Sequence, residues 1–385
     1  MKDIFDNRYF YINKFLMCCI GQWPFYSAIR NLFIQCFIFL NLIIFFIITI
    51  GGAIKEHDST EKVMEGLPII FTGFNSLVYF IVCSFKRNML SRLFNDFKYN
   101  VEFWSSKEEQ LIIFNHANNG RILTICLIGS LFVTGILFFG TSLTSQILDI
   151  ILPLNESRPK KFPFQVYYYV DCPEDYFYFI VIHFSFLGLI VVFIVLSAET
   201  VFAVFTEHAC SLFKIVSLQL KKINSVNSEI ENMKALIFCI EHHNRAFEFC
   251  RSIESLYSPY FLFMLVAYSA FISVSLIEVV LNFNSFEIAL RCGANLIVGL
   301  FFIFLKSFLV QRFMDYGTGL ADTIYESDWY EMSVKMRKIL LFIMIRSRTP
   351  CKVTAGKLKD LSLTNVCSLL QASFSSFTLL MSVAT

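Results

Sequence analysis

The residues best suited to chemistry in this sequence are three histidines that lie close to glutamates. His208 and His242 each follow a glutamate, and His243 is the next residue in the chain. A zinc hydrolase needs the spacing His-Glu-x-x-His, and the sequence lacks it. It also lacks a Gly-x-Ser-x-Gly turn, a phosphate loop and a Gly-rich dinucleotide turn. We therefore predict histidines on solvated helix faces, no enzyme activity, no cofactor or metal ion, and no nucleic-acid partner.

A second group of polar residues lies inside long apolar segments. A charge at the centre of a bilayer costs roughly 2.5–3.5 kcal/mol on insertion scales, so such residues indicate function by default. Glu287 and Arg291 are four residues apart and can pair on one helix face, and Glu278 is also within reach of Arg291. Lys306 is expected to extend its ammonium group to the membrane surface. Three deeper polar residues are candidates to line a cavity among aromatic rings: Asn75, His183 and Asn295.

The composition that surrounds these residues is that of a membrane protein. Apolar residues make up 56% of the chain and charged residues only 16%, against about 25% charged in soluble domains. The 46 phenylalanines are too many for a water-soluble fold of this size to bury. About 20 apolar residues cross a bilayer as a helix. We predict an all-α, polytopic membrane protein, a single domain over residues 1–385, with seven transmembrane helices near 31–54, 63–85, 122–143, 176–198, 257–281, 288–310 and 362–384.

The basic residues predict how these helices are oriented. Of the 32 lysines and arginines, 25 fall in the N-terminal segment and the loops 86–121, 199–256 and 311–361, and five fall in the alternate loops. Cytoplasmic loops carry the excess of Lys and Arg, so the N-terminus is expected in the cytoplasm and the C-terminus outside. The only Asn-x-Ser/Thr acceptor, Asn155, then lies in an outer loop, where glycosylation takes place. This orientation excludes a G-protein-coupled receptor, whose N-terminus is extracellular.

Most of the twelve cysteines lie in spans or in loops expected to face the cytoplasm, which is a reducing compartment. Cys172 alone falls in an outer loop. Its pairing with Cys292, near the outer end of the sixth span, is the one disulfide that the sequence leaves open.

Two of the predicted cytoplasmic loops have a helical pattern. The segment 198–257 has no Gly or Pro and repeats apolar residues at helical spacing. We expect the fourth span to continue as a helix, turn near 224–227 and return into the fifth span. A further helix is expected near 332–346, in the loop 311–361. Together these helices predict a cytoplasmic anchor layer that joins subunits, and packing within one chain is the alternative.

The last predicted span carries a stripe of small residues. Ser368, Ala372, Ser375, Leu379 and Ser382 recur at steps of three and four and share one helix face. Two interpretations are open, which are close helix packing by small residues in a membrane and the lining of a pore. The opposite face is expected to carry larger apolar residues: Val366, Leu370, Phe374, Phe377 and Met381.

Several short patterns resemble the insect odorant receptor family. Towards the C-terminus they are Arg346-Ser347, Pro350-Cys351, Thr354-Ala355-Gly356-Lys357, Leu361-Ser362-Leu363 and Ser376-Phe377-Thr378-Leu379-Leu380. The start Arg8-Tyr9-Phe10 with Gly21-Gln22-Trp23-Pro24, and the segment Tyr325-Glu326-Ser327-Asp328-Trp329-Tyr330, are similar to a hymenopteran branch of the family. Gln22 and Ser376 depart from the family pattern, and the departure at Ser376 leaves details of the pore wall open.

The resemblance implies a tuning subunit of an odorant-gated, non-selective cation channel. Such a subunit assembles with a shared coreceptor into a heterotetramer in the plasma membrane of olfactory sensory neurons, surrounded by membrane lipid. Its last helix lines the pore, with Leu379 and Val383 at the positions of the gate and Ser375 and Ser382 beside them.

The resemblance also implies an odorant site in the outer halves of spans two, three, four and six. The expected ligand is a small apolar volatile or a cuticular odorant, and a long-chain cuticular hydrocarbon is one guess. The alternatives are a gustatory-type receptor channel of similar topology and a transporter, which would predict inverted repeats and broken helices. The predicted site residues are Ile70, Phe71, Phe74, Asn75, Val78, Val133, Ile136, Phe139, Phe179, Ile182, His183, Phe186, Asn295 and Val298.

Overall fold

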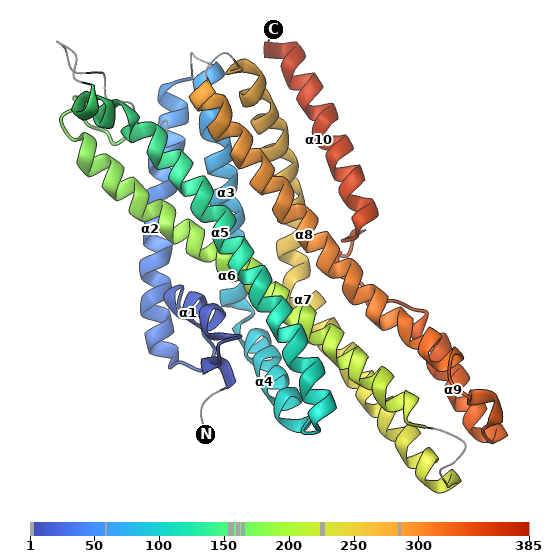
Figure 1. The fold of residues 1–385 in the computed structure, drawn as a ribbon. Helices are drawn as coiled ribbons and strands as arrows, with labels where there is room; N and C mark the ends of the chain where they lie inside the picture. The colour runs from blue at the N-terminus through green and yellow to red at the C-terminus, as the bar shows by residue number, and fades with distance from the viewer. Residues whose placement is uncertain are drawn as a thin grey trace.

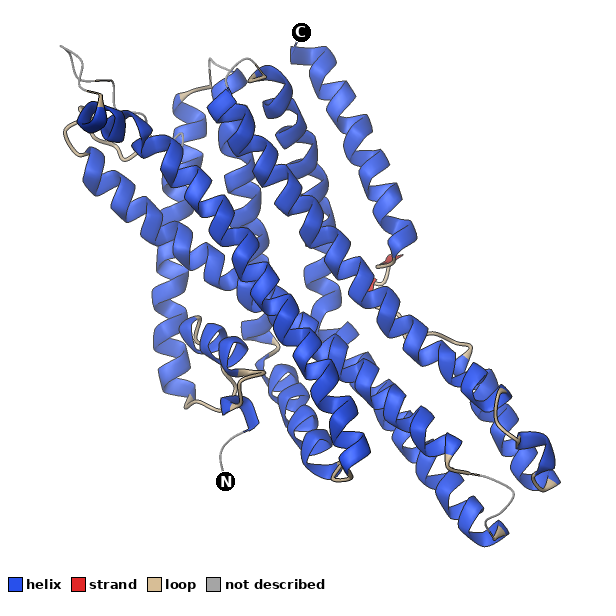
Figure 2. Cartoon of the chain, viewed as in Figure 1, coloured by secondary structure: helices blue, strands red, loops and turns tan. Residues whose placement is uncertain are grey.

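The computed structural model describes residues 4–57, 60–152, 158, 162, 166–223, 228–283 and 286–384, and almost all of them are helical (Figure 2). A short 3₁₀ helix η1 (Ile4–Asp6) leads into the first α-helix, and a second 3₁₀ helix is η2 (Trp329–Glu331). The α-helices are α1 (Tyr11–Cys19), α2 (Ala28–Lys55), α3 (Thr60–Phe85), α4 (Arg87–Phe103), α5 (Lys107–Ile151), α6 (Phe177–Lys221), α7 (Glu229–Leu281), α8 (Phe286–Tyr325), α9 (Val334–Ser347) and α10 (Leu363–Ala384).

A helix covers each of the seven predicted spans: α2, α3, α5, α6, α7, α8 and α10. Among the described residues, the first six of these are long and apolar enough to cross a membrane by length and composition. The helix α10 is not among the six. The two ends of the chain lie at opposite ends of the bundle (Figure 1), as an odd number of spans requires. We call the end with the C-terminus the outer end and the other the inner end.

Three helices run on from the bundle towards the inner end, and the sequence predicts this for two of them, α6 and α7. The helices α6 and α7 form a long antiparallel pair on either side of residues 224–227, which lie outside the description. The helix α7 begins with a capping box, in which Ser228 and Glu231 each bond the other's backbone N–H. The helix α8 extends in the same direction and is followed by α9, and α4 lies at the same end (Figure 1). Together these segments form the inner layer.

The helix α6 is the centre of the inner layer. Every residue from Ile194 to Phe213 is buried, so the protein surrounds the helix on all sides. Aromatic rings make many of these contacts: Phe202 packs edge-on against Phe261, and Phe205 against Phe249. The enclosure also covers charged residues, among them Glu199 and Glu207, which therefore need partners inside the protein.

A two-stranded ribbon fixes the start of α10 to α7. The strands β1 (Thr354–Ala355) and β2 (Lys359–Asp360) pair antiparallel, with Thr354 opposite Asp360. The turn between them holds Gly356 at φ +60°, and its N–H donates to the carbonyl of Ser258 at 2.9 Å. A Cβ at Gly356 would lie 2.8 Å from Leu262 Cδ2 on α7, so only glycine fits. From this turn α10 runs towards the outer end beside α7 and α8 (Figure 1).

Candidate ligand cavity and pore helix

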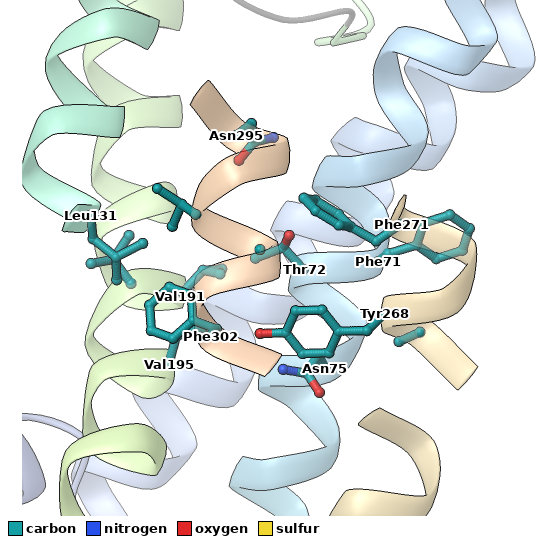
Figure 3. Close-up of a pocket in the computed structure, with 14 residues that line it drawn as sticks. Phe71, Thr72, Asn75, Leu131, Val191, Val195, Tyr268, Phe271, Asn295 and Phe302 are labelled. Carbon is teal, nitrogen blue, oxygen red and sulfur yellow. The ribbon is translucent and has the colours of Figure 1, made fainter. Parts of the chain in front are cut away.

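A cavity of about 80 Å³ lies among five helices in the outer part of the bundle (Figure 3). Most of its wall consists of aromatic and branched aliphatic side chains, the composition that suits an apolar ligand. The helix α3 contributes Phe71, Thr72 and Asn75; α5 Leu131; α6 Val191, Val192 and Val195; α7 Ala267, Tyr268 and Phe271; and α8 Asn295, Val298, Gly299 and Phe302.

Helical spacing explains why these residues meet. On α7 and on α8 the lining residues recur at steps of three and four, so one face of each helix borders the cavity. Gly299 has a specific packing role, because a Cβ there would lie 2.5 Å from Cε1 of Phe271. The Phe271 ring therefore rests on the α8 backbone, and any larger residue at position 299 would displace the ring.

The structure brings four of the predicted ligand residues into the cavity wall, namely Phe71, Asn75, Asn295 and Val298. The other predicted residues whose side chains are described do not line it. Six of these face outward from the bundle, and Phe139 lies outside the described side chains. The exposed residues are Phe74, Val133, Ile136, Phe179, Ile182 and Phe186, whereas Ile70, Val78 and His183 are partly buried elsewhere.

His183 has its own partner outside the cavity. Its Nδ1 lies 2.8 Å from the hydroxyl of Tyr168 in the outer loop, and its ring stacks on Phe179. The α7 wall of the cavity, which includes the polar residue Tyr268, was not predicted from the sequence. A tyrosine within an apolar span, one turn from Phe271, was a signal that could have directed attention to α7.

An ion pair lies next to the cavity, inside the bundle. Lys306 Nζ is 2.6 Å from Glu199 Oε1, and both side chains are only 3% exposed. The ammonium group lies 5.0 Å from the ring centre of Tyr268 and 5.5 Å from that of Tyr260. The prediction that Lys306 extends to the membrane surface is therefore wrong. Its partner is supplied by the enclosed helix α6, more than a hundred residues away in the sequence.

Lys306 also borders the foot of α10. A second cavity, of about 30 Å³, is lined by Lys306, by Ser362 just before α10, and by the first turns of α10, including Asn365 and Leu369. Because the Lys306 ammonium group lies 5.0 Å from the ring centre of Tyr268, this one lysine borders both the wall of the ligand cavity and the space at the start of the last helix.

At the outer end, Arg291 has an ion-pair partner that the sequence did not predict. Arg291 forms an ion pair with Glu65 of α3 and lies 5.4 Å from the ring centre of Phe138. Glu278 is buried nearby, and the side chain of Glu287 lies outside the description. Cys172 and Cys292 are both free, the first exposed and the second buried. Asn155, the predicted glycosylation site, also falls outside the described residues.

The three histidines near glutamates are buried, so the prediction of solvated helix faces is wrong. Burial lowers the pKa of His208 to about 3, and burial together with Arg346 lowers the pKa of His243 to about 4. His242 packs between the rings of Phe103 and Trp104. All three are packing residues of the inner layer, and no three His, Cys, Asp or Glu side chains within the described ranges are grouped to hold a metal ion.

Glu207 is the centre of a charged cluster in the inner layer. It is almost fully buried, its Oε2 lies 2.8 Å from His116 Nδ1, and both its carboxylate oxygens accept from Arg312. The cluster joins α5, α6 and α8. A buried carboxylate needs partners of this kind, because unpaired it would carry a large desolvation cost.

On α10 the small-residue stripe faces away from the rest of the chain. Ser373 and Leu369 are buried against the bundle, and the Ser273 hydroxyl donates to the carbonyl of Ser373 at 2.8 Å. The stripe is exposed along its described length, and Leu379 is 67% exposed. On the opposite face Leu370 and Phe374 are also exposed, whereas Val366, Phe377 and Met381 are partly buried. The side chain of Val383 lies outside the description.

Comparison with known proteins identifies the family of this fold. The family model described as 7tm Odorant receptor matches residues 59–374. The chain belongs to the odorant receptor family. Odorant receptor 13a of Drosophila melanogaster is 22% identical over 343 residues, which cover 81% of this chain and 78% of that protein. Odorant receptor 22c of the same species is 24% identical over 152 residues, 37% of this chain and 38% of that one.

The fold of an odorant receptor is also found by structural comparison. Olfactory receptor OR5 from Machilis hrabei in complex with eugenol superposes with a TM-score of 0.79, at 16% identity and 97% coverage of both chains. A second structure of that receptor gives 0.75, at 17% identity, covering 98% of this chain and all of that one. The predicted resemblance, the all-α fold and the absence of enzyme activity are thereby confirmed. The narrower resemblance to a hymenopteran branch stays a prediction.

Proposed function

We propose that this odorant receptor is the ligand-binding tuning subunit of a heteromeric cation channel in the plasma membrane of olfactory neurons. The observation that carries the proposal is the position of the cavity. Its wall is mostly apolar, and Lys306 lies 5.0 Å from the ring centre of the wall residue Tyr268 and borders, together with the first turns of α10, a second small cavity. Occupation of the cavity can therefore act on α10, whose outward face is free to line a pore with neighbouring subunits.

The decisive experiment measures currents from cells that express this chain with and without the coreceptor, on a panel of volatile odorants. We expect odorant-evoked current only when both subunits are present. Robust odorant current from this chain alone, with the coreceptor shown to be absent, would contradict the heteromeric part of the proposal. The bound eugenol in the related olfactory receptor makes that compound a sensible member of the panel.

Two phenylalanines, one inside the cavity and one outside it, can locate the site. Phe71 lines the cavity, whereas Phe186 lies outside it and faces outward from the bundle. Phe71→Ala should change the rank order of odorants, and Phe186→Ala should leave the order unchanged. Both variants should keep the current evoked by a direct agonist of the coreceptor. If Phe186→Ala changed the order and Phe71→Ala did not, the site would instead lie among the wider set of residues predicted from the sequence.

The orientation of the chain is part of the same proposal. Epitope tags at the two ends, stained on intact and permeabilised cells, should place the N-terminus inside and Thr385 outside. An N-terminal tag that is stained on intact cells would contradict this orientation. Glycosidase treatment should lower the apparent mass of the wild-type protein and leave that of Asn155→Gln unchanged. This result would locate the predicted glycan at Asn155.

A further inference from the structure

A layer of charged residues lies outward of the ligand cavity. Asn295, at one end of the cavity in Figure 3, is one helical turn along α8 from Arg291. Arg291 is 7% exposed, forms an ion pair with Glu65 of α3, and holds its guanidinium 5.4 Å from the ring centre of Phe138 on α5. Glu278 of α7 is buried nearby. We call these four residues the outer cap: Glu65, Phe138, Glu278 and Arg291.

The helical register places the outer cap directly over the cavity. Each cap residue is seven residues outward from a residue that lines the cavity on the same helix. The four pairs are Glu65 with Thr72, Phe138 with Leu131, Glu278 with Phe271, and Arg291 with Val298. Seven residues are nearly two turns, so both members of a pair lie on the same helix face, about 10 Å apart along the helix axis. Four helices therefore each direct a cap residue over the outer end of the cavity.

The ion pair of the outer cap bridges two helices on either side of the cavity. Within the described part of the chain, α3 packs mainly against α2, α6 and α7. Both α3 and α8 line the cavity, α3 with Phe71 and α8 with Asn295. Glu65 and Arg291 join these two helices outward of the cavity. A molecule that moved from the outer surface into the cavity between α3 and α8 would have to separate the two charges.

This ion pair can open at a lower cost than the pair beside the inner part of the cavity. The Glu65 side chain is 28% exposed, so water can solvate its carboxylate when the pair separates. Lys306 and Glu199 are both 3% exposed, and their separation would leave two buried charges without partners. The outer cap is therefore the charged boundary of the cavity that thermal motion can open and close.

We propose that the outer cap is the entrance gate of the ligand cavity, through which odorants enter from the extracellular side and leave again. This inference rests on the proposed function. An entrance gate controls the rates of entry and exit and leaves the affinity unchanged, because the same barrier is crossed in both directions. The cap differs in this respect from the wall residues of the cavity, which contact the bound odorant and determine its affinity.

The test measures access to the cavity with a small neutral thiol reagent, so it requires no knowledge of the odorant. Ala267 lines the cavity and lies in the segment 252–291, which has no cysteine of its own. Methyl methanethiosulfonate is added outside cells that carry Ala267→Cys with the coreceptor, and mass spectrometry follows the modification of this segment. Glu65→Gln keeps the size of the side chain and removes its charge. It should speed the modification about tenfold, which corresponds to a barrier lowered by about 1.4 kcal/mol.

Two controls separate opening of the cap from loosening of the whole protein. Lys62→Met breaks the exposed ion pair with Glu56 near the outer end of α3, and it should leave the rate unchanged. Cys250 is buried in the inner layer and should react as slowly in Glu65→Gln as in the unaltered cap. Phe138→Leu removes the ring beside the guanidinium and should also speed the modification. It decides the matter if Glu65→Gln fails to reach the surface.

Odorant-evoked currents provide a second readout. For each active odorant of the panel, onset and decay after washout should quicken together in Glu65→Gln, with an unchanged half-maximal concentration. An unchanged rate of thiol modification in both Glu65→Gln and Phe138→Leu would overturn the entrance gate and favour entry from the lipid between the helices. A shifted half-maximal concentration with unchanged rates would also overturn it. No response to any odorant, with normal coreceptor current, would overturn the proposed function, whereas the thiol reaction would still decide whether the cap closes the cavity.

Discussion

The two halves of α6 differ in how far the protein encloses them. Towards the outer end, Phe179, Ile182 and Phe186 are exposed on one face, and the opposite face borders the cavity. Towards the inner end every residue from Ile194 to Phe213 is buried. One helix thus joins a thinly enclosed half, where a ligand can displace side chains, to a half that is fixed by packing on all sides. The difference suggests that ligand binding alters the outer half while the inner layer holds the helices in register.

The largest effect is expected at the boundary between the two halves. Lys306→Met removes the partner of Glu199 and leaves a buried carboxylate unpaired, which typically costs 3–5 kcal/mol, as an order of magnitude. Thermal unfolding of the purified receptor in detergent should show a large loss of stability, and surface expression should fall. Glu199→Leu combined with Lys306→Met should recover most of the loss, since apolar residues often replace a buried ion pair without cost.

The control for this pair is an exposed one. Lys352 and Asp360 lie 2.7 Å apart, but their side chains are 50% and 37% exposed. Lys352→Met should therefore change the stability by at most about 1 kcal/mol. Equal effects of the two lysine substitutions would mean that Lys306 is hydrated in the assembled receptor and that the boundary between the halves is not dry.

The next effect compares two phenylalanines of α6 directly. Phe205 is fully buried between the rings of Phe94 and Phe249, and Phe186 is 43% exposed. Phe205→Ala should destabilise the protein by about 3–5 kcal/mol, because it leaves a cavity in packed surroundings. Phe186→Ala should cost less than about 1 kcal/mol, since nearly half of its surface gains no packing. Similar melting temperatures for the two variants would remove the distinction between the halves.

Acid should weaken the inner layer through His243. Its pKa is lowered to about 4 from a usual 6.5, so the folded state favours the neutral ring. Above about pH 6.5 the ring is neutral in both the folded and the unfolded state, and the folded state keeps its full stability. Stability is lost as the pH falls towards 4, because over this range the unfolded state binds a proton that the folded state does not. The loss amounts to about 3 kcal/mol, at roughly 1.4 kcal/mol for each pKa unit. His243→Gln should flatten the dependence of the unfolding temperature on pH over this range, and His57→Gln, at an exposed site, should not.

Helix positions could be predicted from the sequence, because apolar length and the absence of Gly and Pro from 198–257 determine them. The orientation of the helix faces could not. Lipid chains are as apolar as leucine, so Ile182 facing lipid and Val191 facing the cavity look alike in sequence. The pairing of buried charges could not be predicted either, for another reason. Nothing local to Lys306 shows that Glu199 on another helix will meet it.

The smallest and most indirect effect is expected at α10, which lies beside the outer part of the bundle. Leu379 is exposed on the stripe that faces away from α7 and α8, where apolar side chains from several subunits would close a pore by excluding water. Leu379→Ser should ease wetting and raise the current without odorant, and Val383→Ser should act in the same direction. The rise should be partial, because coreceptor subunits would still contribute their own apolar residues. Phe374→Ser lies on the flank of α10 and should instead reduce assembly or surface expression. If Leu379→Ser and Val383→Ser channels reach the surface with unchanged leak, permeability and odorant response, the stripe does not line the pore, and its small residues serve helix packing.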